Sequence, residues 1–101
     1  MRMLLSVKIP HEPFNAKVRD GSAGAIMAKI VEDAKPEAVY FTEEDGHRCA
    51  VMVINVENAS QVPVFAEPWF LNFNGDCRFR IVMSPEDLER AGLEELGKKW
   101  A

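Results

Sequence analysis

The chain has 101 residues, of which 48% are hydrophobic and 28% are charged, and its formal net charge is −4. This length and composition fit a single globular domain over residues 1–101, and they exclude a disordered chain, a collagen and a disulfide scaffold. No uncharged apolar run approaches the roughly 18 residues that cross a bilayer. The net negative charge opposes nucleic-acid binding, so we expect neither a membrane nor a nucleic acid as partner.

The N-terminal segment favours a strand over a signal peptide. Its apolar stretch is short, Lys8 interrupts it, and no small-residue cleavage site follows. Alternate residues of 2–9 are apolar, as in a strand: Met3, Leu5, Val7 and Ile9. We therefore expect a cytoplasmic protein in which Cys49 and Cys77 are reduced thiols.

Helical patterns follow this strand. Residues 14–19 predict a short helical turn that stops near Gly21, and Ser22 is a candidate N-cap for the next helix. That helix ends at Lys35-Pro36, and its apolar residues fall at helical spacing: Ala23, Ile26, Met27, Ile30, Val31 and Ala34.

Two strands follow, over residues 37–43 and 48–56, and Asp45-Gly46 between them predicts a hairpin. The second of these strands is apolar on both faces, which is typical of a strand covered on both sides. Residues 58–73 indicate another helix, in which Pro68 predicts a kink or break.

The C-terminal part of the chain predicts one more strand and an additional helix. Residues 77–83 have strand periodicity, and Ser84-Pro85 is a strong helix start. An apolar stripe then follows at Leu93, Leu96 and Trp100.

The order β-α-β-β-α-β, with an extra C-terminal helix, predicts an α+β fold: a ferredoxin-like sandwich with a four-stranded antiparallel sheet in the order 4-1-3-2. Two helices then cover one face of the sheet and leave the other face bare. A soluble monomer avoids such an apolar surface. We expect a homodimer joined through the sheet face; the alternative is that the C-terminal helix folds back over the sheet.

Two local sequences accompany this order of elements: Val7-Lys8-Ile9-Pro10 ends the first strand, and Ala66-Glu67-Pro68-Trp69-Phe70 lies in the second long helix. The pattern resembles the dimeric α/β-barrel superfamily of small bacterial proteins, and at these two places it is similar to the muconolactone isomerases. The resemblance implies a dimeric barrel. The superfamily also includes cofactor-independent and haem-degrading monooxygenases, but no histidine lies where it would support a haem ligand. We therefore expect no cofactor.

Three cations are predicted to point toward the bare face: Lys8, Arg78 and Arg80. Ser6, Tyr40 and Thr42 are candidates to join them. One interpretation is a pocket for a carboxylate or enolate, in which arginine clamps the ligand. The other is a strand edge protected by charge, or arginines paired with Glu43 or Glu67.

The remaining candidates also have two interpretations. Trp69 and Phe70 form either an aromatic wall of the pocket or ordinary packing. His11, beside Glu12, is either an acid/base group or a solvated loop residue. Tyr40 and Glu43 are further acid/base candidates.

His47 and Cys49 share a strand face, but two ligands do not make a zinc site, and we expect no metal. A strand between Cys49 and Cys77 places them beyond disulfide reach.

These observations leave more than one function open. The first hypothesis is a homodimer that binds a small anionic or aromatic ligand between its sheets. The alternative is a small cofactor-independent isomerase or monooxygenase acting on a carboxylate-bearing aromatic or lactone-type substrate. A third is an interaction module without a ligand. No phosphate loop, nucleophile elbow or metalloprotease motif is present in the sequence.

Overall fold

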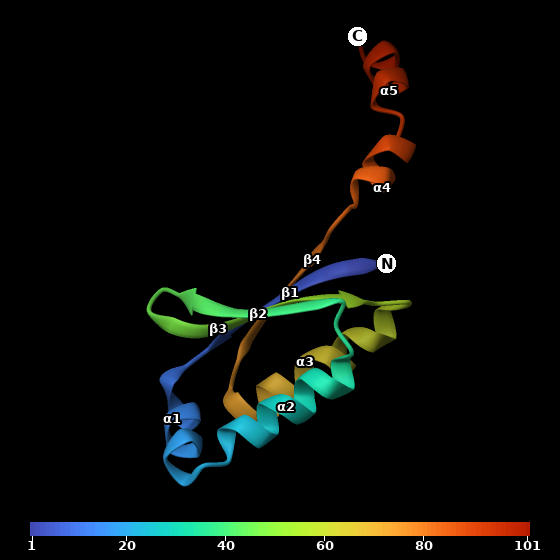
Figure 1. Ribbon diagram of the computed structural model, residues 1–101. Helices are drawn as coiled ribbons and strands as arrows, with labels where there is room; N and C mark the ends of the chain where they lie inside the picture. Colours follow the sequence, from blue (N-terminus) through green and yellow to red (C-terminus); the bar gives the residue numbers. More distant parts are fainter.

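Four strands form one antiparallel sheet in the order β2-β3-β1-β4 in the computed structural model, which describes all 101 residues (Figure 1). The strands are β1 (Arg2–Ile9), β2 (Ala38–Glu44), β3 (His47–Asn55) and β4 (Asp76–Ile81). The predicted α+β fold and the predicted strand order 4-1-3-2 are confirmed. With its helical crossovers, the chain has the ferredoxin-like topology.

Three helices cover one face of this sheet: α1 (His11–Asp20), α2 (Ala23–Ala34) and α3 (Val62–Phe73), the last preceded by the short 3-10 turn η1 (Ala59–Gln61) (Figure 1). Their ends follow the sequence signals. Gly21 ends α1 in the left-handed conformation with a φ of 84°, and Lys35 ends α2 in the same conformation. Ser22 occupies the N-cap position of α2, but its side chain makes no capping hydrogen bond.

The core lies between the sheet and the helices. Every second residue of the central strands points into it, which is why the alternation in residues 2–9 predicted the strand correctly. Trp69 and Phe73 of α3 are fully buried, and their rings lie 6.0 Å apart. The strands contribute Leu5, Val7, Ile9, Ala50, Met52 and Ile54.

The hairpin between β2 and β3 is confirmed in detail. Asp45 and Gly46 have φ angles of 52° and 77°. Positive φ at both central residues is the type I′ turn, whose twist matches that of the flanking strands.

Of the kink or break expected at Pro68, the break is wrong, because α3 continues from Val62 to Phe73 with Pro68 inside it. The proline removes one backbone hydrogen bond, at a cost of about 3 kcal/mol in a regular helix. Buried side chains on both sides of it, Ala66 before and Trp69 and Phe73 after, hold the helix against the sheet. Their burial outweighs the lost bond.

The C-terminal segment does not fold back over the sheet. Residues 82–101, which we call the C-terminal arm, contain the short helices α4 (Pro85–Arg90) and α5 (Leu93–Lys99) and project away from the domain (Figure 1). The molecule is 60 Å long, and its radius of gyration is 17.0 Å, whereas a compact domain of this length has about 13 Å. The single extra helix expected from the sequence is therefore two helices, separated at Gly92. None of the helices is long and apolar enough to cross a membrane.

Candidate functional site: the open face of the sheet

The face of the sheet opposite α1, α2 and α3, which we call the open face, carries the predicted cations. The strand register places cross-strand neighbours in rows across this face: Thr42-Cys49-Lys8-Asp76, Tyr40-Val51-Ser6-Arg78 and Ala38-Val53-Leu4-Arg80. Lys8, Arg78 and Arg80 thus lie on one face together with Ser6, Tyr40 and Thr42, as the alternation in the sequence indicated.

A hollow of about 500 Å³ lies over part of this face. We call it the open-face hollow. Its lining consists of Cys49 and five polar or charged residues: Ser6, Glu43, Glu44, Arg78 and Arg80. The residues come from all four strands, so only the assembled sheet brings them together.

The charges of the open face are only partly paired. Arg78 donates to Glu44 at 2.9 Å, so that side chains from the two edge strands meet across the middle of the sheet. Lys8 donates to Asp45 in the hairpin turn at 3.1 Å. Arg80 has no ion-pair partner. The hollow therefore presents one guanidinium group free to bind an anion.

Cys49 forms part of the lining of the hollow and is almost fully buried, with 4% of its surface exposed. Its thiol lies 3.9 Å from a carboxylate oxygen of Glu44. Burial raises the pKa of the Cys49 thiol, and the negative charge of Glu44 raises this pKa further, while the positive charge of Arg78 lowers it. The thiol is thus held in its protonated form and is a poor nucleophile at neutral pH.

Both cysteines are free, and β1 lies between their strands, as predicted. Cys77 faces the helices, because its partner in β1 is the buried Val7. Burial is the main cause that raises the pKa of the Cys77 thiol to about 11, with smaller contributions from Asp76 and Glu67.

The acid/base candidates lie in different places. Glu43 lines the open-face hollow, and its carboxylate accepts a hydrogen bond from the backbone N–H of Gly46. Tyr40 is on the open face and is 72% exposed. His11 lies at the start of α1 and stacks on His47 of β3, with ring centroids 4.5 Å apart. The sequence did not indicate this pair of imidazoles, because the two residues are far apart in the chain.

The aromatic residues proposed as a pocket wall lie in α3, on the other side of the sheet from the open-face hollow. Trp69 is fully buried in the core, and Phe70 is 41% exposed on the same helix. The structure does not bring either residue to the arginines, and the packing interpretation describes Trp69.

No group of three or more His, Cys, Asp or Glu side chains is arranged to hold a metal ion. His47 and Cys49 are two residues apart on β3, but Cys49 has Glu44 as its side-chain neighbour and His47 has His11.

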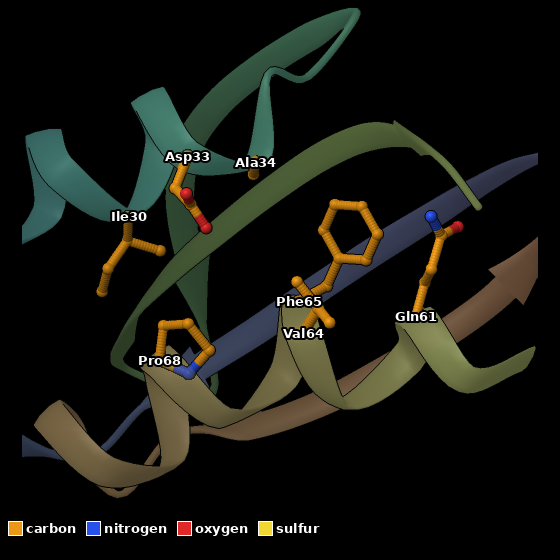
Figure 2. Close-up of a pocket in the computed structure, with 7 residues that line it drawn as sticks. All are labelled: Ile30, Asp33, Ala34, Gln61, Val64, Phe65 and Pro68. Atoms are coloured by element: carbon orange, nitrogen blue, oxygen red, sulfur yellow. The ribbon is translucent and has the colours of Figure 1, made fainter. Parts of the chain in front are cut away.

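The sequence also gave no sign of a groove between α2 and α3. Figure 2 shows it from the side chains that line it, and its volume is about 230 Å³. The lining is largely apolar, with Asp33 as the one ionised side chain: Ile30, Asp33, Ala34, Gln61, Val64, Phe65 and Pro68. Without a cation, this groove is a weaker candidate for an anionic ligand than the open-face hollow.

Comparisons of the sequence with known proteins find no relative. No protein-family model matches the sequence, and no curated protein matches it. Among solved structures, the chain is similar to a de novo designed protein described as Ferredog-Diesel, with a TM-score of 0.45 and 12% identity, over 80% of this chain and 85% of that chain. The assignment of a ferredoxin-like α+β protein rests on its own strand order and crossovers.

Proposed function

We propose that the protein is a homodimer, joined through the open faces of two sheets, that binds a small anionic or aromatic molecule in the open-face hollow. The observation that carries this proposal is the unpaired guanidinium of Arg80 beside Arg78 on a face that the chain itself leaves uncovered. The arm, which was the alternative cover, projects away from the sheet in Figure 1.

The charges of the hollow define the class of ligand. Arg80 and Arg78 are bidentate donors suited to a carboxylate. Glu44 neutralises Arg78, so a ligand with a single carboxylate matches the one free cation better than a dianion. The carboxylate of Glu44 also accepts hydrogen bonds, which suits a hydroxyl group on the ligand. The exposed ring of Tyr40 and the side chain of Val51 offer an apolar surface beside these groups.

Thermal shift with benzoate and 4-hydroxybenzoate, with benzyl alcohol as the uncharged control, tests the ligand class. A ligand at ten times its Kd stabilises the folded state by about 1.4 kcal/mol, a rise in Tm on the order of 6 °C for a domain of this size. We expect the two acids to raise the Tm and the alcohol to leave it unchanged.

The Arg80→Gln variant assigns the site. Loss of a charge-assisted hydrogen bond costs about 1.5–3 kcal/mol, so the Kd of the acid rises roughly ten-fold or more. Arg19→Gln is the matched control, because Arg19 is exposed on α1 and pairs only with Glu12. If both variants lost binding equally, or if neither variant lost binding, the acid would not bind in the open-face hollow.

Catalysis by the same hollow is the second candidate, because Glu43 is one of the residues that line the hollow together with Arg78 and Arg80. A lactone-type substrate held through its carboxylate by Arg80 would then lose the C–H proton beside its carbonyl group to Glu43 and regain a proton at that carbon from Glu43. Incubation of carboxylate-bearing lactones in D2O, followed by NMR, detects exchange of this C–H proton for deuterium. Turnover in the natural protein that disappears in Glu43→Gln, with ligand binding retained, would establish an enzyme.

A further inference from the structure

The C-terminal arm presents apolar side chains that the domain does not cover. Neither α4 nor α5 has a buried residue. Leu93 is 59% exposed and Trp100 is 77% exposed, and Met83, Leu88 and Leu96 are exposed as well. A stripe of this kind on a soluble protein is typical of a surface that binds another protein.

The sequence of the arm nevertheless contains clear helix-capping signals. Ser84 and Asp87 make a reciprocal capping box at the start of α4, and Pro85 occupies the first turn. Gly92 separates the two helices with a φ of 71°. Helices of six and seven residues are not stable alone in water, because packing supplies most of the stability of a short helix. The arm therefore needs a surface on which to pack.

The domain from which the arm extends does not provide that surface. The arm continues in the direction of β4 and rises on the open-face side of the sheet (Figure 1). A backbone hydrogen bond of 3.3 Å from the N–H of Val82 to the carbonyl of Arg2 fixes only its base. To cover its own sheet, the chain would have to reverse its direction at residues 82–84.

The open face has a matching surface beyond the hollow. The apolar half of the open face contains Leu4, Ala38, Tyr40, Val51 and Val53. Arg80 borders this half without an ion-pair partner, whereas Arg2 borders it paired with Glu37. Residues 84–101 carry five acidic and three basic side chains, so the net charge of the arm is opposite to that of Arg80.

We infer that the arm of each protomer packs on the apolar half of the open face of a second copy, with Leu93, Leu96 and Trp100 turned toward the sheet. This inference rests on the homodimer proposed above and identifies the segment that holds it together. The exchange is reciprocal, so a twofold dimer buries two arms and two open faces. Each open-face hollow is then bordered by residues of both copies.

Light scattering of the full-length double variant Leu93→Ser/Leu96→Ser tests the inference. Both leucines are exposed in the single chain, so the substitutions leave the domain intact, which an unchanged far-UV spectrum verifies. We expect the dimer Kd to rise by roughly 100-fold or more, because both leucines lose their buried area. Glu95→Ser/Lys98→Ser is the matched control, because it changes the opposite side of α5. It removes the ion pair between these two residues and so does not alter the net charge of the chain. We expect this control to leave the dimer Kd unchanged.

A third variant locates the docking surface. Tyr40→Ser changes an exposed side chain of the edge strand β2 on the open face and is expected to weaken the dimer as well. A natural dimer whose Kd is unaffected by the leucine substitutions would overturn the exchange of arms but not the homodimer. A dimer weakened by the leucine substitutions but not by Tyr40→Ser would overturn the open face as the docking surface. A natural protein that is monomeric at all concentrations would overturn both proposals.

Discussion

At the scale of single residues, two glycines of this chain occupy opposite environments. Gly75 is buried, and a Cβ atom placed there would lie 2.9 Å from the Cγ1 atom of Val7 in the core. Gly24 is in α2, and a Cβ atom placed there meets nothing within 4 Å. The same substitution by alanine therefore has opposite expected effects at the two positions.

Gly75→Ala is expected to lower the free energy of unfolding by about 1–3 kcal/mol, because the core must shift to admit the methyl group. Gly24→Ala is expected to raise it by about 0.5–1 kcal/mol, because alanine is the better helix former. Urea unfolding of both variants measures the difference. Equal effects of the two substitutions would contradict the close packing of Gly75 against Val7.

The charges around Cys49 predict how the reactivity of its thiol depends on pH. Glu44 raises the pKa of this thiol and Arg78 lowers it. In Glu44→Gln the pKa is expected to fall, and in Arg78→Gln it is expected to rise, so the pH midpoint of alkylation moves in opposite directions. Iodoacetamide labelling in a Cys77→Ala background, followed over pH by mass spectrometry, gives both midpoints. Midpoints that moved together would indicate that access, and not charge, controls the thiol.

At the scale of the elements, the capping box of α4 makes the first helix of the arm sensitive to acid. Hydrogen bonds with Ser84 lower the pKa of Asp87, and Arg90 contributes to the shift. A carboxylate with a lowered pKa stabilises the helix above its ordinary pKa, and the stabilisation is lost as the pH falls through the lowered value.

The α4 helix is accordingly expected to be intact at pH 6 and to fray below about pH 4, which is the ordinary pKa of an aspartate. Ser84→Ala removes the other half of the box and costs about 1 kcal/mol of helix stability at pH 6. Backbone chemical shifts of residues 85–90 report both effects. A helix that persisted at pH 2 in Ser84→Ala would show that packing alone maintains it.

At the scale of the whole molecule, the two tryptophans report separately on the domain and the arm. Trp69 is fully buried, whereas Trp100 is 77% exposed in the single chain. If the arm packs on a second copy, the indole of Trp100 is shielded at high protein concentration and its emission moves to longer wavelength on dilution.

Trp100→Phe should abolish this dependence on concentration, and the emission of Trp69 should remain blue-shifted throughout. The measurement is a fluorescence spectrum across the dilution range in which light scattering shows dissociation. A dimer that dissociates without any change in the emission of Trp100 would place the arm outside the interface.

The local sequence determined the elements of this protein and their order. The two-residue period of residues 2–9, the Asp45-Gly46 turn and the Ser84-Pro85 helix start depend on neighbours in the chain, so they could be predicted from it. The alternation also placed Lys8, Arg78 and Arg80 on one face, because the direction of a strand side chain follows from its parity once the buried row is known.

Only the tertiary structure decided which side chains meet and which surfaces stay uncovered. The pairing of Arg78 with Glu44, the stacking of His11 on His47 and the burial of Trp69 all join segments far apart in the chain. Pro68 remains inside a helix because the burial of its neighbours stabilises the helix by more than one lost hydrogen bond costs.

The apolar stripe of residues 93–100 fitted either a tail folded over its own sheet or a free arm. The spacing of the stripe specifies which face of the helix is apolar, but not which surface covers that face. The direction in which β4 leaves the sheet decides between them, and it carries the arm away from the domain.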